Sequence, residues 1–313
     1  MEIKFDHKPV MLNEVLSGLK INPDGIYIDC TLGGGGHSEK ILEKLSPKGM
    51  LIGLDKDQDA LDYTTNKLGK KYPNLKTFHT DFNDVYEVFD YLQINKVDGV
   101  LIDLGVSSYQ IDTPERGFSF RFDGPLDMRM DKSQKLTAKE VVNTYTYEQL
   151  VKIFYEYGEE EFSKPIAKNI IKAREIKPIE TTFELSKIIE ESMPKSVIYK
   201  RGGADKKVFQ AIRIEVNNEL DRLFDTIVYL GKSLKSGGRM AVLTFHSLED
   251  RIVKNAFKEL TTDCICPPKT PICICHHKKQ GILINKKPIT ATDEELANNS
   301  RSSCAKLRIF EKI

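Results

Sequence analysis

The segment from Ile26 to His37 limits the possible folds of this chain more than any other, because a short apolar run leads directly into four consecutive glycines. The β-branched and aromatic residues 26–28 predict a buried strand, and residues 38–45 have a helical pattern. Glycine has no Cβ and tolerates positive φ, so the backbone of such a turn can approach a ligand closely. The start of the helix adds unpaired N–H groups. We therefore expect a strand, a glycine turn and a helix that together bind a nucleotide-like ligand.

The spacing of the glycines narrows the choice of nucleotide. The dinucleotide fingerprint G-x-G-x-x-G fits only loosely, because counting from Gly33 puts Ser38 in the last position. No lysine follows the glycines, which disfavours a phosphate loop for a triphosphate. The run from Asp29 to Gly35 is instead similar to the acidic, glycine-rich loop of S-adenosylmethionine (SAM) methyltransferases, with Thr31 in place of the first glycine. A glycine turn without any ligand is the alternative.

Apolar runs alternate with helical patterns through the first third of the chain. We expect further strands at residues 50–54, 75–78 and 99–104, and a crossover helix at residues 58–68. Strands that alternate with helices predict an α/β fold with a parallel, doubly wound sheet. Ligands of such sheets bind at the carboxyl ends of the strands.

Two carboxylates are expected at this edge of the sheet. Asp55 ends the second strand and lies twenty residues after Gly35, an offset that suits a carboxylate accepting both hydroxyls of a ribose. Asp103 stands in an otherwise apolar strand, where burying a carboxylate without partners is costly, so we expect it to face a ligand. Capping of the loop at Ser107 is the alternative role for Asp103.

A loop at residues 114–131 combines aromatic and basic side chains. Three phenylalanines are interleaved with three arginines: Phe118, Phe120 and Phe122 with Arg116, Arg121 and Arg129. Aromatic rings can stack on bases and guanidinium groups can contact phosphates, so the loop could form a surface for single-stranded RNA. A hydrophobic plug that fastens the loop to the protein is an equal alternative for the phenylalanines.

The middle of the chain has helical start signals and no strand pattern. Thr137, Thr146 and Thr181 are each followed by Glu or Gln three residues later. We expect a helical domain at residues 113–214, inserted into a sheet domain made of residues 1–112 and 215–313. Residues 195–207 should form a basic loop, either in contact with phosphates or merely solvated.

The chain should then return to the sheet. We expect one long amphipathic helix over residues 209–230, a strand at residues 239–245 and an edge strand at residues 307–310. Ser247, with Asp250 three residues later, resembles a helix N-cap pair. His246, at the end of a strand, could contact the substrate.

Charge and composition exclude several classes of protein. The 313 residues carry 47 Lys+Arg against 46 Asp+Glu, so a nucleic-acid surface would have to be a local patch. No apolar run is long enough for a transmembrane helix, and residues 1–9 lack the apolar core of a signal peptide. We expect a cytoplasmic protein that has no contact with membranes.

Four of the six cysteines lie close together in the sequence. Cys264, Cys266, Cys273 and Cys275 precede a pair of histidines, which makes a structural zinc site conceivable. Zinc ribbons usually have C-x-x-C spacing, however, so a loop of reduced thiols is the alternative. We expect no catalytic metal.

Several motifs together are similar to one family, the ribosomal RNA small subunit methyltransferase H family. They lie at residues 29–38, 103–108, 115–120, 124–130 and 245–251. The resemblance covers nearly the whole chain and departs from the family pattern at residues 299–304, where the usual proline is missing. It implies a Rossmann-like class I SAM-dependent methyltransferase sheet with an inserted small helical domain. The cofactor positions that it implies are Gly35, Gly36, His37, Asp55, Phe82, Asp103 and Gln110.

The same resemblance implies a reaction and its partners. The enzyme would transfer a methyl group from SAM to the exocyclic N4 of a cytidine in the decoding region of 16S rRNA. Its partner would be the small ribosomal subunit, and a homodimer is left open. Asp103 is the candidate for orienting the amine, with Phe118, Phe120 or Tyr109 stacking on the target base. A nicotinamide-dependent oxidoreductase and a non-catalytic RNA-binding module are the alternative classes.

Overall fold

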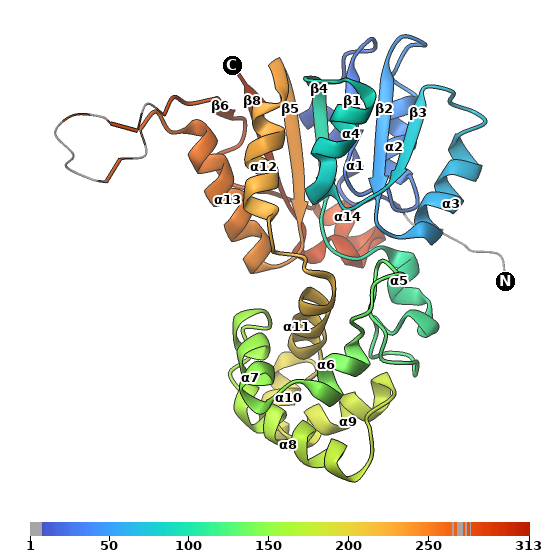
Figure 1. The fold of residues 1–313 in the computed structure, drawn as a ribbon, viewed down its shortest axis with the longest axis vertical. Helices are drawn as coiled ribbons and strands as arrows, with labels where there is room; N and C mark the ends of the chain where they lie inside the picture. The colour runs from blue at the N-terminus through green and yellow to red at the C-terminus, as the bar shows by residue number, and fades with distance from the viewer. Residues whose placement is uncertain (1–7, 265, 268–271, 273, 276) are drawn as a thin grey trace. The chain divides into compact units, whose positions relative to one another are not determined.

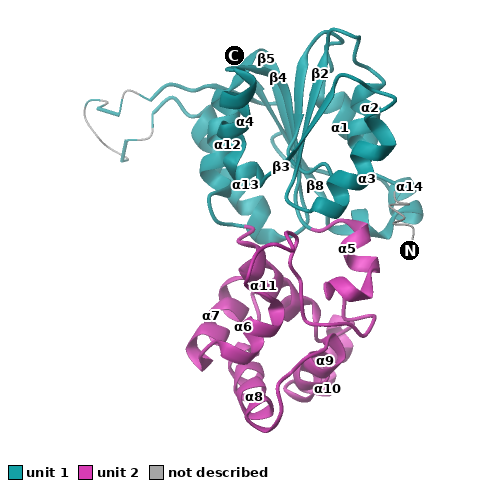
Figure 2. Ribbon diagram, turned by 45° about the vertical axis from the view of Figure 1, so that its right-hand side comes forward, with its two compact units in different colours: residues 1–105, 220–313 teal, residues 106–219 magenta. Residues whose placement is uncertain are grey.

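A computed structural model describes residues 8–264, 266–267, 272, 274–275 and 277–313. The chain divides into two compact units (Figure 2): unit 1 contains residues 1–105 and 220–313, and unit 2 contains residues 106–219. Unit 2 therefore begins and ends outside the range 113–214 that the sequence pattern suggested for an insertion.

Unit 1 is built around one mixed sheet with the strand order β3-β2-β1-β4-β5-β8-β6, and β7 pairs with β8. Strands β1 to β5 pair in parallel, and β8 is antiparallel to its neighbours. The strands are β1 (Ile26–Asp29), β2 (Met50–Asp55), β3 (Leu75–His79), β4 (Val97–Asp103), β5 (Leu234–Thr244), β6 (Gly281–Leu283), β7 (Ile289–Thr290) and β8 (Lys306–Lys312). The predicted parallel, doubly wound arrangement is confirmed.

The strand order contains a switch point beside β1. From β1 the chain extends the sheet in one direction through β2 and β3, and then returns to place β4 on the other side of β1. The connections after β1 and β4 therefore leave the sheet in opposite directions. In open α/β sheets, ligands bind in the crevice at the carboxyl ends of the strands at such a point.

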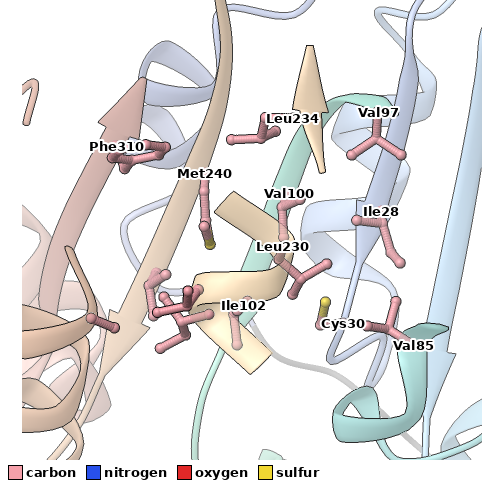
Figure 3. Close-up of a cluster of buried hydrophobic side chains, with 14 of the residues drawn as sticks. Ile28, Cys30, Val85, Val97, Val100, Ile102, Leu230, Leu234, Met240 and Phe310 are labelled. Carbon is pink, nitrogen blue, oxygen red and sulfur yellow. The ribbon is translucent and has the colours of Figure 1, made fainter. Parts of the chain in front are cut away.

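Helices cover both faces of this sheet (Figure 1). Side chains alternate along each strand, so Tyr27 and Leu101 belong to one buried cluster and Ile28 and Val100 to another. The first face is covered by α1 (Leu12–Leu19), α2 (Gly36–Leu42) and α3 (Gln58–Leu68), and the second by α4 (Val85–Leu92), α12 (Leu223–Lys232) and α13 (Ser247–Thr261). Figure 3 shows the second cluster, in which Leu230 of α12 and Val85 of α4 lie over Ile102 and Cys30.

Short elements complete unit 1: η1 (Phe82–Asp84), α14 (Asp293–Asn298) and η3 (Ser300–Cys304). With 15 residues, α13 is the longest described helix. Among the residues that the structure places, no helix has the length and apolar character needed to cross a lipid bilayer.

Unit 2 is helical and has its own core. Its elements are α5 (Ser108–Asp112), η2 (Pro114–Arg116), α6 (Ala138–Thr144), α7 (Tyr147–Glu156), α8 (Ser163–Ile176), α9 (Thr182–Glu191), α10 (Lys195–Arg201) and α11 (Lys206–Asn217). Phe154, Ile166 and Ile212 are fully buried in the shared core of these helices. The predicted starts at Thr137, Thr146 and Thr181 are confirmed, since each threonine forms a capping box with the Glu or Gln that follows.

Three predicted elements differ in part from the structure. The long helix over residues 209–230 is two helices, because Asn218 and Arg222 both have positive φ and break the helical path between α11 and α12. The basic loop at residues 195–207 contains the helix α10, which Gly202 ends at φ +67°. The strand at residues 307–310 is not at an edge, because β8 lies between β5 and β6.

Candidate active site

The glycine turn is fixed to the neighbouring strand and helix by hydrogen bonds. The helix α2 begins at Gly36, two residues earlier than predicted, and Gly33 and Gly35 have φ values of +50° and +72°. The Gly33 N–H donates to Asp55 Oδ2 at 2.7 Å, and Thr64 Oγ1 donates to the Gly33 carbonyl at 2.7 Å. The turn after β1 is therefore held against the end of β2 and the side of α3.

Replacing Gly35 with alanine should destabilise the protein by about 2–4 kcal/mol. A Cβ at this residue would lie 2.7 Å from Thr64 Cγ2, in addition to the strain of the left-handed backbone. Gly202→Ala is the matched control, because Gly202 also has positive φ but a Cβ there would meet nothing within 4 Å. Urea denaturation of both variants measures the difference, and equal losses would contradict the steric argument.

Asp29 and Thr31 connect the ends of β1 and β4. Asp29 is buried and accepts hydrogen bonds from Ser38 Oγ at 2.7 Å and from the Thr31 N–H at 3.1 Å. Burial nevertheless raises the pKa of Asp29 above its ordinary value. Thr31 Oγ1 accepts from the Asp103 N–H at 2.7 Å. This threonine, which replaces a glycine of the usual loop pattern, therefore ties the glycine turn to the end of β4.

Asp55 stands at the end of β2, as predicted. Its Oδ2 accepts from the Gly33 N–H at 2.7 Å and its Oδ1 accepts from the Asp57 N–H at 2.8 Å. Burial raises the pKa of Asp55 to about 6. A carboxylate oxygen can accept two hydrogen bonds, so each oxygen has capacity for one hydroxyl of a ribose in addition to its backbone donor.

Asp103 ends β4 and faces His37, the second residue of α2. Asp103 Oδ2 lies 3.6 Å from His37 Nδ1, and His37 Nε2 lies 2.9 Å from the Val10 carbonyl oxygen. A carbonyl can only accept, so Nε2 carries the proton in the neutral ring and the lone pair of Nδ1 faces the carboxyl group. Asp103 Oδ1 is buried and has no hydrogen-bond partner among the described residues.

The surroundings of Asp103 favour its protonated form. Burial, followed by the charges of Asp29 and Glu249, raises the pKa of Asp103 to about 8. A carboxyl group with such a pKa can both accept and return a proton near neutral pH. Perturbed carboxyl groups at the switch point of a sheet are typical of functional sites.

Glu249, in the first turn of α13, lies at the same edge of the sheet, next to the end of β5. Its Oε2 accepts from the N–H groups of Phe245 and His246, at 2.7 and 3.2 Å. His246 caps α13 through Nδ1, which accepts from the Glu249 N–H at 3.4 Å, so the predicted N-cap at Ser247 was wrong. Sequence reasoning missed Glu249, although its position three residues after His246 matches a capping box.

The other predicted cofactor residues have different surroundings. Gly36 is the first residue of α2, and a Cβ there would lie 3.3 Å from the ring of Pro9. Phe82 begins η1 after β3 and packs against the core on the α4 face. Gln110 lies in unit 2, where it forms a capping box with Ser107. Ser107 rather than Asp103 therefore caps α5.

The aromatic and basic loop of unit 2 is largely structural. Arg116 is buried and donates to the carbonyls of Arg129 and Met130 at 2.9 and 3.1 Å, and Arg129 forms an ion pair with Asp127 at 2.8 Å. Phe118 belongs to the core of unit 2, as the alternative of a hydrophobic plug predicted. These side chains are therefore unsuited to the RNA contacts suggested from the sequence.

A separate hollow of about 290 Å³ lies beside α3 and β3, lined in part by Gln58, Thr77 and His79. It includes none of the predicted site residues. The carboxyl edge around β1 and β4 therefore remains the candidate active site, because the glycine turn and the perturbed carboxyl groups lie there.

A doubly wound sheet with a glycine turn after β1 and carboxylates after β2 and β4 defines a nucleotide-binding sheet of the methyltransferase type. The chain belongs to the MraW methylase family, whose model matches residues 4–313. The family relationship expected from the sequence motifs is thereby confirmed.

Two relatives illustrate this relationship. The chain is 49% identical to the ribosomal RNA small subunit methyltransferase H of Halothermothrix orenii, over 99% of each chain. It is 51% identical to the protein of the same name from Caldicellulosiruptor saccharolyticus, over 99% of this chain and 100% of the relative. A solved SAM-dependent O-methyltransferase from Thermotoga maritima matches at 9% identity and a TM-score of 0.40, over 98% of this chain and 67% of that one.

Proposed function

We propose that this enzyme transfers a methyl group from SAM to the exocyclic N4 of a cytidine in the decoding region of 16S rRNA. One observation carries the proposal: the glycine turn, Asp55 and Asp103 surround the switch point of a chain that is about half identical to ribosomal RNA small subunit methyltransferases over its full length. The identity of the acceptor atom rests on the motifs shared with that family.

The residues at the carboxyl edge fit SAM. The buried, unpartnered Oδ1 of Asp103 and the clustered carboxyl groups of Asp29 and Glu249 favour a ligand that carries positive charge. SAM supplies a methyl group on a positively charged sulfur, which makes it a strong methyl donor. Asp55 would accept the ribose hydroxyls, and the turn at Gly33 and Gly35 would allow close approach of the backbone. Gly36, His37, Phe82 and Gln110 remain proposed cofactor contacts.

Asp103 would orient and deprotonate the amine. The exocyclic amine of cytosine is a weak nucleophile, because its lone pair is delocalised into the ring. A carboxylate that accepts one amine hydrogen turns the lone pair toward the methyl group and receives the proton that must leave. His37 lies next to this carboxyl group, with Nδ1 at 3.6 Å from Asp103 Oδ2 and Nε2 at 2.9 Å from the Val10 carbonyl oxygen.

Unit 2 offers an exposed aromatic surface for RNA. Phe122 and Phe183 are 46% and 48% exposed, and their segments are joined by a hydrogen bond from Thr182 Oγ1 to the Phe122 carbonyl at 2.8 Å. Arg121 is exposed next to Phe122. Such a surface can stack on unpaired bases and contact a phosphate. Because Phe118 is buried in the core of unit 2, Phe120 and Tyr109 remain the proposed partners of the target base, and Phe122 is our candidate for stacking on other unpaired bases.

The double variant Arg121→Ala/Phe122→Ala should bind small ribosomal subunits about 10- to 100-fold more weakly, since it removes one stacking ring and one guanidinium group. Its affinity for SAM should stay unchanged. Tyr155→Ala is the control, because Tyr155 is an exposed aromatic residue of α7 in the same unit. Filter binding with labelled subunits gives the affinities, and equal affinities for all three proteins would exclude the proposed RNA surface.

We also propose that the enzyme acts in the cytoplasm on the small ribosomal subunit. Association of two copies stays a prediction of the family resemblance, and light scattering of the purified protein tests it.

Transfer of label tests the proposed reaction. Purified protein is incubated with methyl-labelled SAM and with small subunits that lack the modification, and the rRNA is then recovered and counted. We expect label in the rRNA, and binding of SAM but not of NADH in parallel titrations. Binding of NADH would indicate an oxidoreductase, and subunit binding without either nucleotide would indicate a non-catalytic RNA-binding module.

A further inference from the structure

The C-terminal part of the connection between α13 and β6 is held to α13 by hydrogen bonds. The helix ends at Thr261 and the strand begins at Gly281. The Gln280 N–H donates to the Leu260 carbonyl at 2.7 Å, and His277 Nε2 lies 3.0 Å from the Glu259 carbonyl oxygen. In the described part of this connection there is no helix or strand. Figure 1 shows the described residues next to α13 and β6 leading away from the sheet.

The sulfur atoms of three cysteines in this connection lie close together. The Sγ atoms of Cys264, Cys266 and Cys275 all lie within 4.8 Å of one another, and those of Cys264 and Cys275 are 3.8 Å apart. Zinc binds thiolates at about 2.3 Å, so two sulfur atoms of a tetrahedral site are separated by about 3.8 Å. A disulfide would require about 2.0 Å. No disulfide joins the cysteines within the described ranges.

We propose that Cys264, Cys266 and Cys275 bind a zinc ion as thiolates and that this ion is structural. Thiolates are soft ligands that select zinc among the common divalent ions of a reducing cell. Tetrahedral structural sites take four protein ligands. Among the described residues, no fourth His, Cys, Asp or Glu side chain joins the three sulfur atoms.

The apolar side chains described near the cysteines are exposed, which favours a metal centre as the source of order in this part of the connection. Ile272 and Ile274 are 75% and 72% exposed. Connections of more than about 15 residues without regular structure are uncommon in compact domains. A segment without a core of its own gains its folding energy from a bound metal, as small zinc modules do.

The cluster lies far from the candidate active site. The helix α13 begins at the carboxyl edge of β5 and has 15 residues, so its two ends are about 22 Å apart. The cysteines follow its C-terminal end, whereas Glu249 lies in its first turn. The zinc ion therefore organises the connection and takes no part in methyl transfer.

Metal analysis tests this site. The full-length enzyme, without a histidine tag, is purified in the absence of chelators and its zinc content is measured by mass spectrometry of the elements. We expect about one zinc ion per chain and its loss in the double variant Cys264→Ser/Cys275→Ser. Cys304→Ser is the control, because Cys304 is exposed and lies outside the cluster. Metal-free wild-type protein, or equal zinc in the double variant, would overturn the proposal.

A second measurement separates loss of the site from general misfolding. Cobalt added to metal-free wild-type enzyme should give the visible absorption bands of a tetrahedral cobalt–thiolate centre, and the double variant should lack them. SAM binding by the double variant should be retained, which shows that the sheet is folded. Mass spectrometry of the alkylated protein under non-reducing conditions completes the test, since a disulfide among these cysteines in freshly purified enzyme would contradict a zinc site.

Discussion

Replacing Asp103 with asparagine should lower kcat, measured at saturating SAM, by about 10²- to 10⁴-fold. The amide has the shape of the carboxyl group but cannot take the amine proton. Single-turnover assays on small subunits give the rate, and calorimetric titration gives the affinity for SAM. Asp90→Asn, which alters an exposed carboxylate of α4, is the matched control and should leave both unchanged. Normal turnover in the Asp103 variant would falsify the proposed role.

The same variant should become more stable than the wild type as the pH rises. Between its ordinary pKa near 4 and its folded-state pKa of about 8, Asp103 binds more protons in the native than in the unfolded protein. The free energy of unfolding therefore falls as the pH rises through this window. Asparagine does not titrate, so the variant should gain on the order of 1–3 kcal/mol relative to wild type at pH 8 and little at pH 4. Urea denaturation at both pH values measures this.

Replacing Asp55 with alanine should raise the Kd for SAM by about 10- to 100-fold, which corresponds to the loss of charged hydrogen bonds to a ribose. The variant also leaves the Gly33 and Asp57 N–H groups without their acceptor, which loosens the glycine turn. Saturating SAM should restore much of kcat, because Asp55 does not contact the amine in our proposal.

Asp55→Asn is the matched variant for this experiment. It keeps one acceptor oxygen and should lose less affinity than the alanine variant. The wild-type affinity should itself fall as the pH drops below about 6, where Asp55 becomes protonated. Calorimetric titrations from pH 5 to pH 8 cover both points, and unchanged SAM affinity in the alanine variant would remove Asp55 from the site.

Local patterns allowed the sheet and its carboxyl edge to be predicted. The apolar strand before the glycines, the strand ending at Asp55 and the strand ending at Asp103 are each set by a few neighbouring residues. Once the strands are known to be parallel, the chain order brings their ends together. The approach of His37 to Asp103 was not predictable in this way, because it depends on how closely the start of α2 lies to the end of β4.

Features that depend on tertiary packing were predicted less well. Arg116 and Phe118 look suited to RNA, yet a buried guanidinium can be satisfied by carbonyl groups that are distant in sequence, as Arg129 and Met130 show. The break at Asn218 was missed because α11 and α12 are both amphipathic and follow each other closely, although α11 packs in the core of unit 2 and α12 in the core of unit 1. Such residues can be assigned only when their partners are known.

Identification of the modified nucleoside tests the central claim most directly. Small subunits that lack the modification are incubated with the enzyme and methyl-labelled SAM, the 16S rRNA is digested to nucleosides, and the labelled nucleoside is identified by chromatography and mass spectrometry. We expect N4-methylcytidine with wild-type enzyme and a strongly reduced amount with Asp103→Asn. Label in a different nucleoside, or none while SAM binding is intact, would contradict the proposed acceptor.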